Sequence, residues 1–396
     1  MSRHGRVLVA MSGGVDSSVT AALLHEEGYD VVGVTMKTWD YATTGGAAEA
    51  RTRGGKEVGC CSLESMNDAR TVAVRLGFPH FVVDIREEFG DGVVERFTSD
   101  YLAGRTPNPC VLCNTHIKWA ALLRRADALG CDLIATGHYA RVRRDEETGR
   151  WVVSRGLDRN KDQSYALWGI AQDHLARTRF PLGAYTKPEI RQLAADFGLD
   201  HVAKKPDSYE ICFIPDNDYR GFLTRRVEGL AERVAGGPFV LETTGETVGR
   251  HRGYPFYTVG QRRGLGLAGA GGAGEAVYVT RIEAATNTVY VGPKEALLGR
   301  TLTARQLTFG KVAGLWDERP ALAQIRYKDP GAPCLVRQTA GDEVEVVFDA
   351  PRAAITPGQA VVLYDGDDVL AGGWIHATGV ASEAAPSDAF IALPTL

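Results

Sequence analysis

The sequence of 396 residues contains no apolar run long enough to cross a membrane or to act as a secretion signal. The segment before the first strand-like run, residues 1–6, is short and leads directly into that run. We therefore expect a cytoplasmic protein with no membrane partner, and a monomer.

Positive charge is not in excess, because 45 Lys and Arg residues stand against 49 Asp and Glu residues, for a formal charge of −4. Binding of nucleic acid would therefore need a local basic face. Hydrophobic residues make up 44% of the chain and charged residues 24%, which are ordinary values for a globular protein. This composition excludes an intrinsically disordered chain.

Cysteine is also scarce. Seven cysteines, an odd number, do not suit the paired framework of a small secreted protein. In the cytoplasm thiols stay reduced, so each cysteine is a candidate for reactivity or metal binding.

The length is enough for two or three domains, and the pattern of the chain changes near residue 215. Before that point, β-branched runs such as 31–34, 81–84 and 133–135 alternate with segments of helical periodicity. This alternation predicts an α/β fold, a doubly wound parallel sheet with helices on both faces, over residues 1–215. Helices are expected at 17–27, at 114–129 and, after Thr186 as N-cap, at 188–197.

Two further domains are expected. Residues 216–290 should form a small central domain that begins with a helix over 217–230. From Val277 onward apolar residues alternate with period two between Gly and Pro turns, a pattern typical of β-strands. The pattern by itself fits a barrel or a sandwich, and we place a C-terminal all-β barrel domain at 291–396. The Gly- and Ala-rich segments 42–59 and 268–274 are expected to be loose loops.

The strongest local motif is Ser12-Gly-Gly-Val-Asp-Ser-Ser18, between a strand over 6–11 and a helix. Its glycines allow close approach of the backbone, and its hydroxyls and N–H groups can donate to a phosphate. A Walker A loop is excluded because no Gly-Lys-Ser/Thr follows, and G-x-G-x-x-G is absent. Asp16 inside this loop suggests a divalent cation that bridges it to phosphates. The alternative is a glycine turn capped by serine.

The second motif, Cys110-Val-Leu-Cys113, follows Thr106-Pro-Asn-Pro109 and precedes the helix expected near Asn114. A thiol at a helix N-terminus has a lowered pKa, because the N–H groups and the dipole stabilise the thiolate, so we expect Cys113 to be nucleophilic. Half of a zinc site and a redox pair are the alternatives, although the adjacent Cys60-Cys61 would be a poor second half. Cys212, between Ile and Phe, would by its neighbours alone be an inert core thiol.

Six ordered motifs resemble the bacterial tRNA-specific 2-thiouridylase family, within the PP-loop ATP pyrophosphatase superfamily. They are Ser12–Ser18, Thr106–Pro109 with Leu112–Asn114, Ala135–Tyr139, Lys161–Tyr165, Ile211–Ile214 and Thr258–Gly266. The resemblance covers nearly the whole chain and reaches Thr356-Pro-Gly-Gln359.

The resemblance implies ATP-dependent 2-thiolation of the wobble uridine of tRNA. ATP would adenylate the uridine C2 oxygen, and persulfide sulfur would then displace AMP, with release of pyrophosphate at the first step. By this resemblance Cys212 receives sulfur from a persulfide-carrying donor protein, and Cys113 is the second catalytic thiol. Many members have Asp where this chain has Cys110, and a thiol is a weaker hydrogen-bond acceptor than a carboxylate.

The resemblance also implies binding residues. ATP would contact Ala10, Met11, Ser12, Gly13, Gly14, Val15, Asp16, Ser17, Met36 and Gly137, with Mg2+ held by the phosphates and Asp16. The target base and the tRNA would contact Asn108, Pro109, Cys110, Lys161, Asp162, Gln163, Arg326 and Tyr327.

A further RNA-facing segment is expected between Glu246 and Glu275, which encloses no acidic residue. It interleaves Arg250, Arg252, Arg262 and Arg263 with Tyr254, Phe256 and Tyr257. Cations suit phosphates and aromatic rings suit splayed bases, whereas a solvated loop is the alternative.

Two other functions stay open from the residues alone. A PP-loop ligase that adenylates a small carboxylate or amide would not depend on Cys113 and Cys212. An RNA-binding protein without enzymatic activity would release no pyrophosphate in the presence of tRNA.

Overall fold

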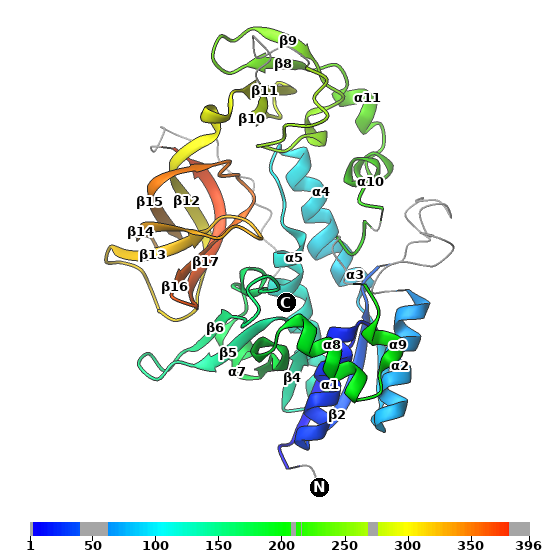
Figure 1. Ribbon diagram of the computed structural model, residues 1–396. Coiled ribbons are helices and arrows are strands. Elements are labelled where there is room, and N and C mark those ends of the chain that lie inside the picture. The colour runs from blue at the N-terminus through cyan, green and yellow to red at the C-terminus, as the bar shows by residue number, and fades with distance from the viewer. Residues whose placement is uncertain (1–2, 40–61, 207–210, 215, 268–275, 380–396) are drawn as a thin grey trace.

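The computed structural model describes residues 3–39, 62–206, 211–214, 216–267 and 276–379 (Figure 1). The two expected loose loops, 42–59 and 268–274, lie outside these residues. Within the described ranges no helix has the length and apolar character that a membrane span requires.

The N-terminal domain is built on a five-stranded parallel sheet in the order β3-β2-β1-β4-β7. Its strands are β1 (Arg6–Ala10), β2 (Asp30–Lys37), β3 (His80–Asp84), β4 (Leu133–Thr136) and β7 (Thr178–Arg179). Successive residues of β1 point to opposite faces, because Val7 and Val9 pack in one buried cluster and Leu8 in another. Helices cover both faces, which confirms the predicted doubly wound α/β fold.

The helices of this domain are α1 (Val15–Glu27), α2 (Leu63–Leu76), α3 (Arg86–Phe89), α4 (Glu95–Leu102), α5 (Pro109–Leu112), α6 (Trp119–Ala128), α7 (Gln172–Ala176), α8 (Lys187–Asp196) and α9 (Asp200–Ala203), with 3-10 turns η3 (Ser164–Ala166) and η4 (Pro181–Ala184). Helix α8 confirms the prediction of a helix after Thr186, whose side chain forms a capping box with Glu189.

Two π-helical turns lie beside the cysteine motif. η1 (Gly90–Val94) joins α3 to α4, and η2 (Cys113–Lys118) joins α5 to α6. The predicted helix start near Asn114 was wrong. Helical structure already begins at Pro109, because Asn108 caps it and proline suits a first helical position. Cys113 therefore lies inside the helical segment rather than before it.

The central domain carries a four-stranded sheet in the order β10-β11-β8-β9. Its elements are α10 (Tyr219–Arg226), α11 (Leu230–Val234), β8 (Pro238–Leu241), β9 (Thr247–Arg250), η5 (Tyr254–Phe256), β10 (Tyr278–Glu283) and β11 (Thr288–Gly292). The single helix expected over 217–230 is wrong, because Gly229 adopts a left-handed conformation (φ +64°) that separates α10 from α11. Strand β11 crosses the domain boundary expected between 290 and 291.

The C-terminal domain is a closed antiparallel barrel, as predicted. After η6 (Lys294–Leu297), its strands are β12 (Leu298–Phe309), β13 (Arg319–Gln324), β14 (Ala332–Ala340), β15 (Glu343–Ala353), β16 (Ala360–Asp365) and β17 (Asp368–Thr378). They pair in the order β12-β15-β14-β13-β16-β17, and β12 also pairs with β17 to close the barrel. Alternate residues such as Val344, Val346 and Phe348 fill its core.

A hairpin from the N-terminal domain extends the barrel sheet. Strands β5 (Ala140–Arg144) and β6 (Trp151–Arg155) pair with each other, and Ser154 of β6 pairs with Asp368 of β17. The hairpin lies below the barrel in the view of Figure 1. The N-terminal and C-terminal domains therefore share one continuous sheet.

Candidate active site

The phosphate loop connects β1 to α1 in the predicted strand-turn-helix arrangement. Gly13 has φ +73°, and a Cβ there would lie 2.0 Å from the Ser65 carbonyl oxygen, so the turn requires glycine. Ser12 N donates to Ser17 Oγ (3.1 Å), and Ser17 Oγ donates to Gly14 O (3.2 Å). These bonds fold the loop back over the start of α1, where the N–H groups of a helix favour an anion.

Other predicted nucleotide residues lie around this loop. Ala10 pairs with Val34 of β2 and with Thr136 of β4, so the ends of the three strands meet. Met36 lies near the end of β2 and is half-buried. Gly137 follows β4, and a Cβ there would lie 2.9 Å from Ser17 N. The fold thus brings together the three segments that we predicted to bind ATP.

Asp16 points toward two residues that the sequence had not assigned to the site. Lys187 Nζ donates to both carboxylate oxygens of Asp16 (2.7 and 2.8 Å), and Tyr139 OH donates to Oδ1 (2.6 Å). The Lys187 side chain is 9% exposed. A buried lysine at the first position of a helix is unusual, since helix N-termini favour negative charge. Sequence reasoning could have used only the position of Lys187, directly after the predicted cap Thr186, because its burial is known from the structure alone.

Lys205 is the second lysine that sequence reasoning missed. Its Nζ donates to Gly13 O (3.2 Å) and forms an ion pair with Asp68 of α2. Both lysines reach the loop from the far end of the domain sequence. Two lysines therefore contact residues of the phosphate loop.

The cysteine loop, residues 104–113, reaches α5 through the two prolines of its motif. Asn108 Oδ1 accepts from Val111 N (3.3 Å) as the helix cap. Cys110 is exposed and Cys113 is buried. The protein around Cys110 desolvates its thiol and so raises the pKa of that thiol, although the residue is exposed.

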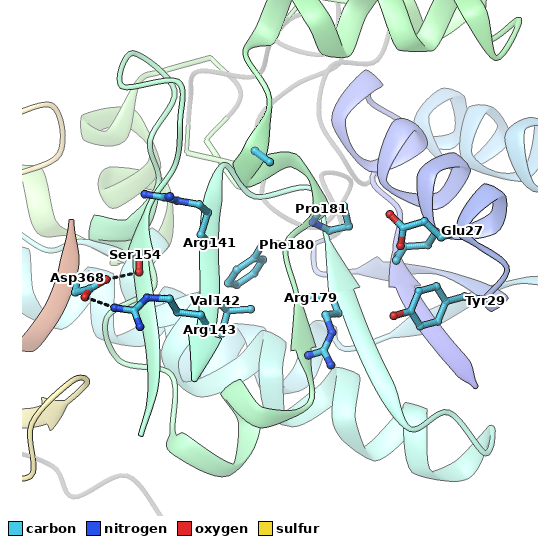
Figure 2. A pocket seen from close by; sticks show the side chains of 12 residues that line it. Glu27, Tyr29, Arg141, Val142, Arg143, Ser154, Arg179, Phe180, Pro181 and Asp368 are labelled. Atoms are coloured by element: carbon cyan, nitrogen blue, oxygen red, sulfur yellow. Dashed lines mark hydrogen bonds and ion pairs between the residues drawn. The ribbon is translucent and has the colours of Figure 1, made fainter. Parts of the chain in front are cut away.

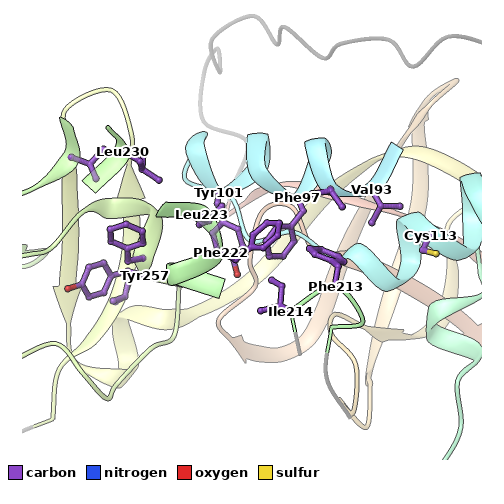
Figure 3. Close-up of a cluster of buried hydrophobic side chains, with 14 of the residues drawn as sticks. Val93, Phe97, Tyr101, Cys113, Phe213, Ile214, Phe222, Leu223, Leu230 and Tyr257 are labelled. Carbon is purple, nitrogen blue, oxygen red and sulfur yellow. The ribbon is translucent and has the colours of Figure 1, made fainter. Parts of the chain in front are cut away.

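Cys113 belongs to a buried apolar cluster (Figure 3). Cys212 packs against the same cluster. Cys212 is half-buried at its edge, and its neighbour Phe213 packs edge-on against Phe89 and Phe97 of the helices that precede the cysteine loop. The fold thus brings the two cysteine segments into one cluster, although they are about a hundred residues apart in the chain.

His138 is a chemistry-bearing residue whose environment makes it inert. Its Nδ1 forms a hydrogen bond with Thr136 Oγ1 (2.7 Å), and its ring packs against those of Trp119 and Phe180. Burial, and to a smaller extent Lys118, lower the pKa of His138 to about 3. The ring is therefore neutral near pH 7.

The predicted tRNA residues divide into an inward and an outward group. Asp162 accepts from Gly156 N (2.9 Å) and Ser164 Oγ (2.8 Å), and Gln163 Oε1 accepts from Tyr139 N (3.0 Å). These bonds give Asp162 and Gln163 structural partners within the protein. By contrast, Arg326 and Tyr327 are exposed on the barrel, after β13.

Tyr165 links the outward group to the cysteine loop. Its ring lies 6.5 Å from that of Tyr327, its hydroxyl donates to Ala360 O (2.9 Å), and the Asn108 side chain is close enough to affect the pKa of that hydroxyl. Asn108 and Tyr327 therefore both lie near Tyr165, where the N-terminal domain meets the barrel.

The segment between Glu246 and Glu275 differs from the prediction. Phe256 and Tyr257 are 8% and 6% exposed and belong to the core, and Tyr254 OH donates to Leu102 O (2.6 Å). Phe256 and Tyr257 cannot stack on bases, because they are buried in the apolar cluster. Arg252, Arg262 and Arg263 are exposed, as expected.

A cavity of about 480 Å³ lies elsewhere, between α1, β5 and η4 (Figure 2). It is lined by Leu24, Glu27, Tyr29, Arg141, Val142, Arg143, Ser154, Arg179, Phe180, Pro181, Ala184 and Asp368. None of the predicted site residues lines it, so we do not assign it to the reaction. Among the described residues no group of three or more His, Cys, Asp or Glu side chains could hold a metal ion. Cys60 and Cys61 lie outside those residues.

Three family models match the chain in order. The one described as tRNA methyl transferase HUP domain covers residues 5–216, tRNA methyl transferase PRC-barrel domain covers 222–293, and aminomethyltransferase beta-barrel domain covers 300–375. The first alone spans more than half of the sequence.

Curated relatives are similar over nearly their full length. The tRNA-specific 2-thiouridylase MnmA of Salinibacter ruber is 67% identical over 385 residues, 97% of this chain and 98% of the relative. Proteins of the same name from Amoebophilus asiaticus (59% over 377 residues, 95% and 96%) and Cytophaga hutchinsonii (56% over 379 residues, 96% and 99%) follow. With identity this high over nearly the whole chain, the chain belongs to the family of tRNA-specific 2-thiouridylases.

Proposed function

We propose that this protein uses ATP to replace the C2 oxygen of the wobble uridine of tRNA by sulfur. The observation that carries the proposal is that two cysteine segments meet in one buried cluster, in a chain that also has a phosphate loop and is 67% identical to a 2-thiouridylase. The family models are described by methyl transfer, but the full-length relatives are named for thiolation, and the cysteines favour sulfur chemistry.

ATP would lie with its phosphates on the loop from Ser12 to Ser17 and its adenine toward Met36. A uridine carbonyl is a poor electrophile, and adenylation of O2 converts that oxygen into a phosphate leaving group. Loop N–H groups and the nearby lysines Lys187 and Lys205 would stabilise the charge on the departing pyrophosphate.

The residues around Asp16 do not form a magnesium site of their own. Both carboxylate oxygens already accept from Lys187, and Tyr139 donates to one of them. Asp16 therefore fits as the partner of a lysine rather than as a direct metal ligand, and we derive no step through the ion.

The sulfur step would use both cysteines. A donor protein would leave a persulfide on Cys212, and the Cys113 thiolate would attack Cys212 Sγ. This attack forms a Cys113–Cys212 disulfide and breaks the persulfide S–S bond, with hydrosulfide as the leaving group. Hydrosulfide would then attack C2 and displace AMP, and a cellular thiol reductant would restore the two thiols.

The tRNA would enter where the barrel meets the cysteine loop. Arg326 and Tyr327 are exposed there, and Asn108 lies beside Tyr165 at the same junction. We assign Lys161 to the same surface. The net charge of −4 would make this contact local and sensitive to salt.

The test is thiolation of unmodified tRNA with ATP, magnesium and a persulfide source, followed by nucleoside analysis. Wild-type protein should form 2-thiouridine with AMP and pyrophosphate, and Cys113→Ser or Cys212→Ser should lower the rate by several orders of magnitude while ATP still binds. Cys334→Ser is the matched control, since burial raises the pKa of that barrel thiol to about 12 and it should not react. A folded wild-type protein that forms no 2-thiouridine, or cysteine variants that keep full activity, would overturn the proposal.

A further inference from the structure

A loop of the barrel holds the cysteine loop by its backbone. Gln359 Nε2 donates to Thr106 O and to Pro107 O, both at 3.1 Å, and Thr106 N donates to Pro357 O (3.2 Å). Gly358 has φ +90°, and a Cβ there would lie 2.9 Å from Thr106 O. The two loops therefore meet without any intervening side chain at Gly358.

The cysteine loop needs an outside donor at this place. Pro107 and Pro109 have no N–H groups, so the segment offers carbonyl acceptors but few donors for its own hydrogen bonds. Pro107 is buried, where an unsatisfied carbonyl is costly. The amide of Gln359 carries two N–H bonds, which match the two carbonyls that it faces.

The donor itself is fixed to the barrel. Ile375 N donates to Gln359 O (2.8 Å), and Gly358 N donates to Ile375 O (3.0 Å), which ties the loop to strand β17. On the other side, Pro107 immediately precedes Asn108, the cap of the helix that carries Cys110 and Cys113. A short path of hydrogen bonds thus leads from a barrel strand to the helix with the predicted nucleophile.

We propose that Gln359 is a positioning residue for sulfur transfer, which holds Cys113 at its working place through the backbone of Thr106 and Pro107. The inference rests on the proposed function for its kinetic part. The barrel would then have a second role besides tRNA contact, because strand β17 would fix the position of the cysteine loop through Gln359. Misplacement of a catalytic group by about 1 Å can cost on the order of 100-fold in rate.

Two variants separate the hydrogen bonds from packing. Gln359→Ala removes the side chain, whereas Gln359→Glu keeps its shape but presents acceptors to two carbonyl oxygens. Both should lower kcat for thiolation on the order of 10- to 100-fold, with KM for ATP unchanged. Gln338→Ala is the control, because Gln338 also binds backbone groups of the barrel, at Leu315 and Gly341, but does not touch the cysteine loop.

Amide hydrogen exchange of the full-length protein supplies a readout that does not depend on activity. Exchange in 104–113 should accelerate by about 10-fold or more in both Gln359 variants, and not in Gln338→Ala. Wild-type exchange rates in the Gln359 variants, or a Gln359→Glu variant as active as wild type, would overturn the inference. A wild-type protein that forms no 2-thiouridine, with faster exchange in the variants, would instead reject the proposed function and keep the mechanical role of Gln359.

Discussion

Lys187 supplies positive charge to the phosphate loop although it is 171 residues from Asp16 in the chain. Its ammonium group is almost completely removed from water and is satisfied by the Asp16 carboxylate. A buried cation paired in this way is retained at a cost in desolvation, which favours a role in binding anions over a role in stability.

We predict that Lys187→Met weakens ATP binding about 10- to 100-fold, because a charged hydrogen bond is lost and Asp16 then repels the phosphates. Titration calorimetry with ATP would measure it. Asp16→Asn in the Lys187→Met background should restore part of the affinity. A double variant that binds ATP more weakly than Lys187→Met alone would instead point to direct use of Asp16.

At the scale of elements, the contact between the phosphate loop and α2 depends on a glycine. Gly13 and Gly77 have similar left-handed conformations, with φ +73° and +79°. A Cβ at Gly77 would meet nothing within 4 Å, whereas one at Gly13 would strike the Ser65 backbone. Substitution of Gly77 therefore measures the energetic cost of the left-handed conformation alone, and substitution of Gly13 adds the cost of the steric clash with Ser65.

We expect Gly77→Ala to cost about 1–2 kcal/mol in the free energy of unfolding, from the left-handed conformation alone. Gly13→Ala should cost about 3 kcal/mol or more and also weaken ATP binding, because the loop must move away from α2. Urea unfolding and ATP titration of both variants would measure these effects. Equal losses for the two variants would contradict the structure.

Predictions for elements succeeded where the signal is local. The strand-loop-helix around Ser12 and the helix capped by Thr186 follow from glycines, hydroxyls and apolar periodicity within a few residues. The start of the cysteine helix was predicted too late, because two prolines looked like an approach to a helix rather than its first turn. The hydrophobic role of Phe256 and Tyr257 was missed, because adjacent arginines suggested an RNA surface.

At the scale of the whole molecule, neighbouring aspartates join the N-terminal hairpin to the barrel. Asp368 accepts from Ser154 Oγ and Arg143 Nη2, both at 2.6 Å, and lies 3.3 Å from Lys311 Nζ, with its side chain 11% exposed. Asp367 pairs with Arg141 and Arg159, but its side chain is 40% exposed. The two residues differ in burial more than in their number of cationic partners.

We predict that Asp368→Ala lowers the free energy of unfolding by about 2–4 kcal/mol, because the buried Ser154 hydroxyl loses its acceptor and Arg143 and Lys311 each lose one of their two carboxylate partners. Asp367→Ala should cost less than about 1 kcal/mol, since water screens its pairs. Urea denaturation followed by tryptophan fluorescence would compare them. A larger loss for Asp367→Ala would contradict the assignment of Asp368 as the main link between the two domains.

The sequence by itself determined the α/β fold with its phosphate loop, the all-β character of the C-terminal domain and the family, because these depend on short motifs and on periodicity along the chain. The tertiary structure decided which distant groups meet. Lys187 reaches Asp16, Gln359 reaches Thr106, and the hairpin of β5 and β6 joins the barrel. Such contacts depend on how distant elements and domains pack together, which the sequence next to each residue does not record.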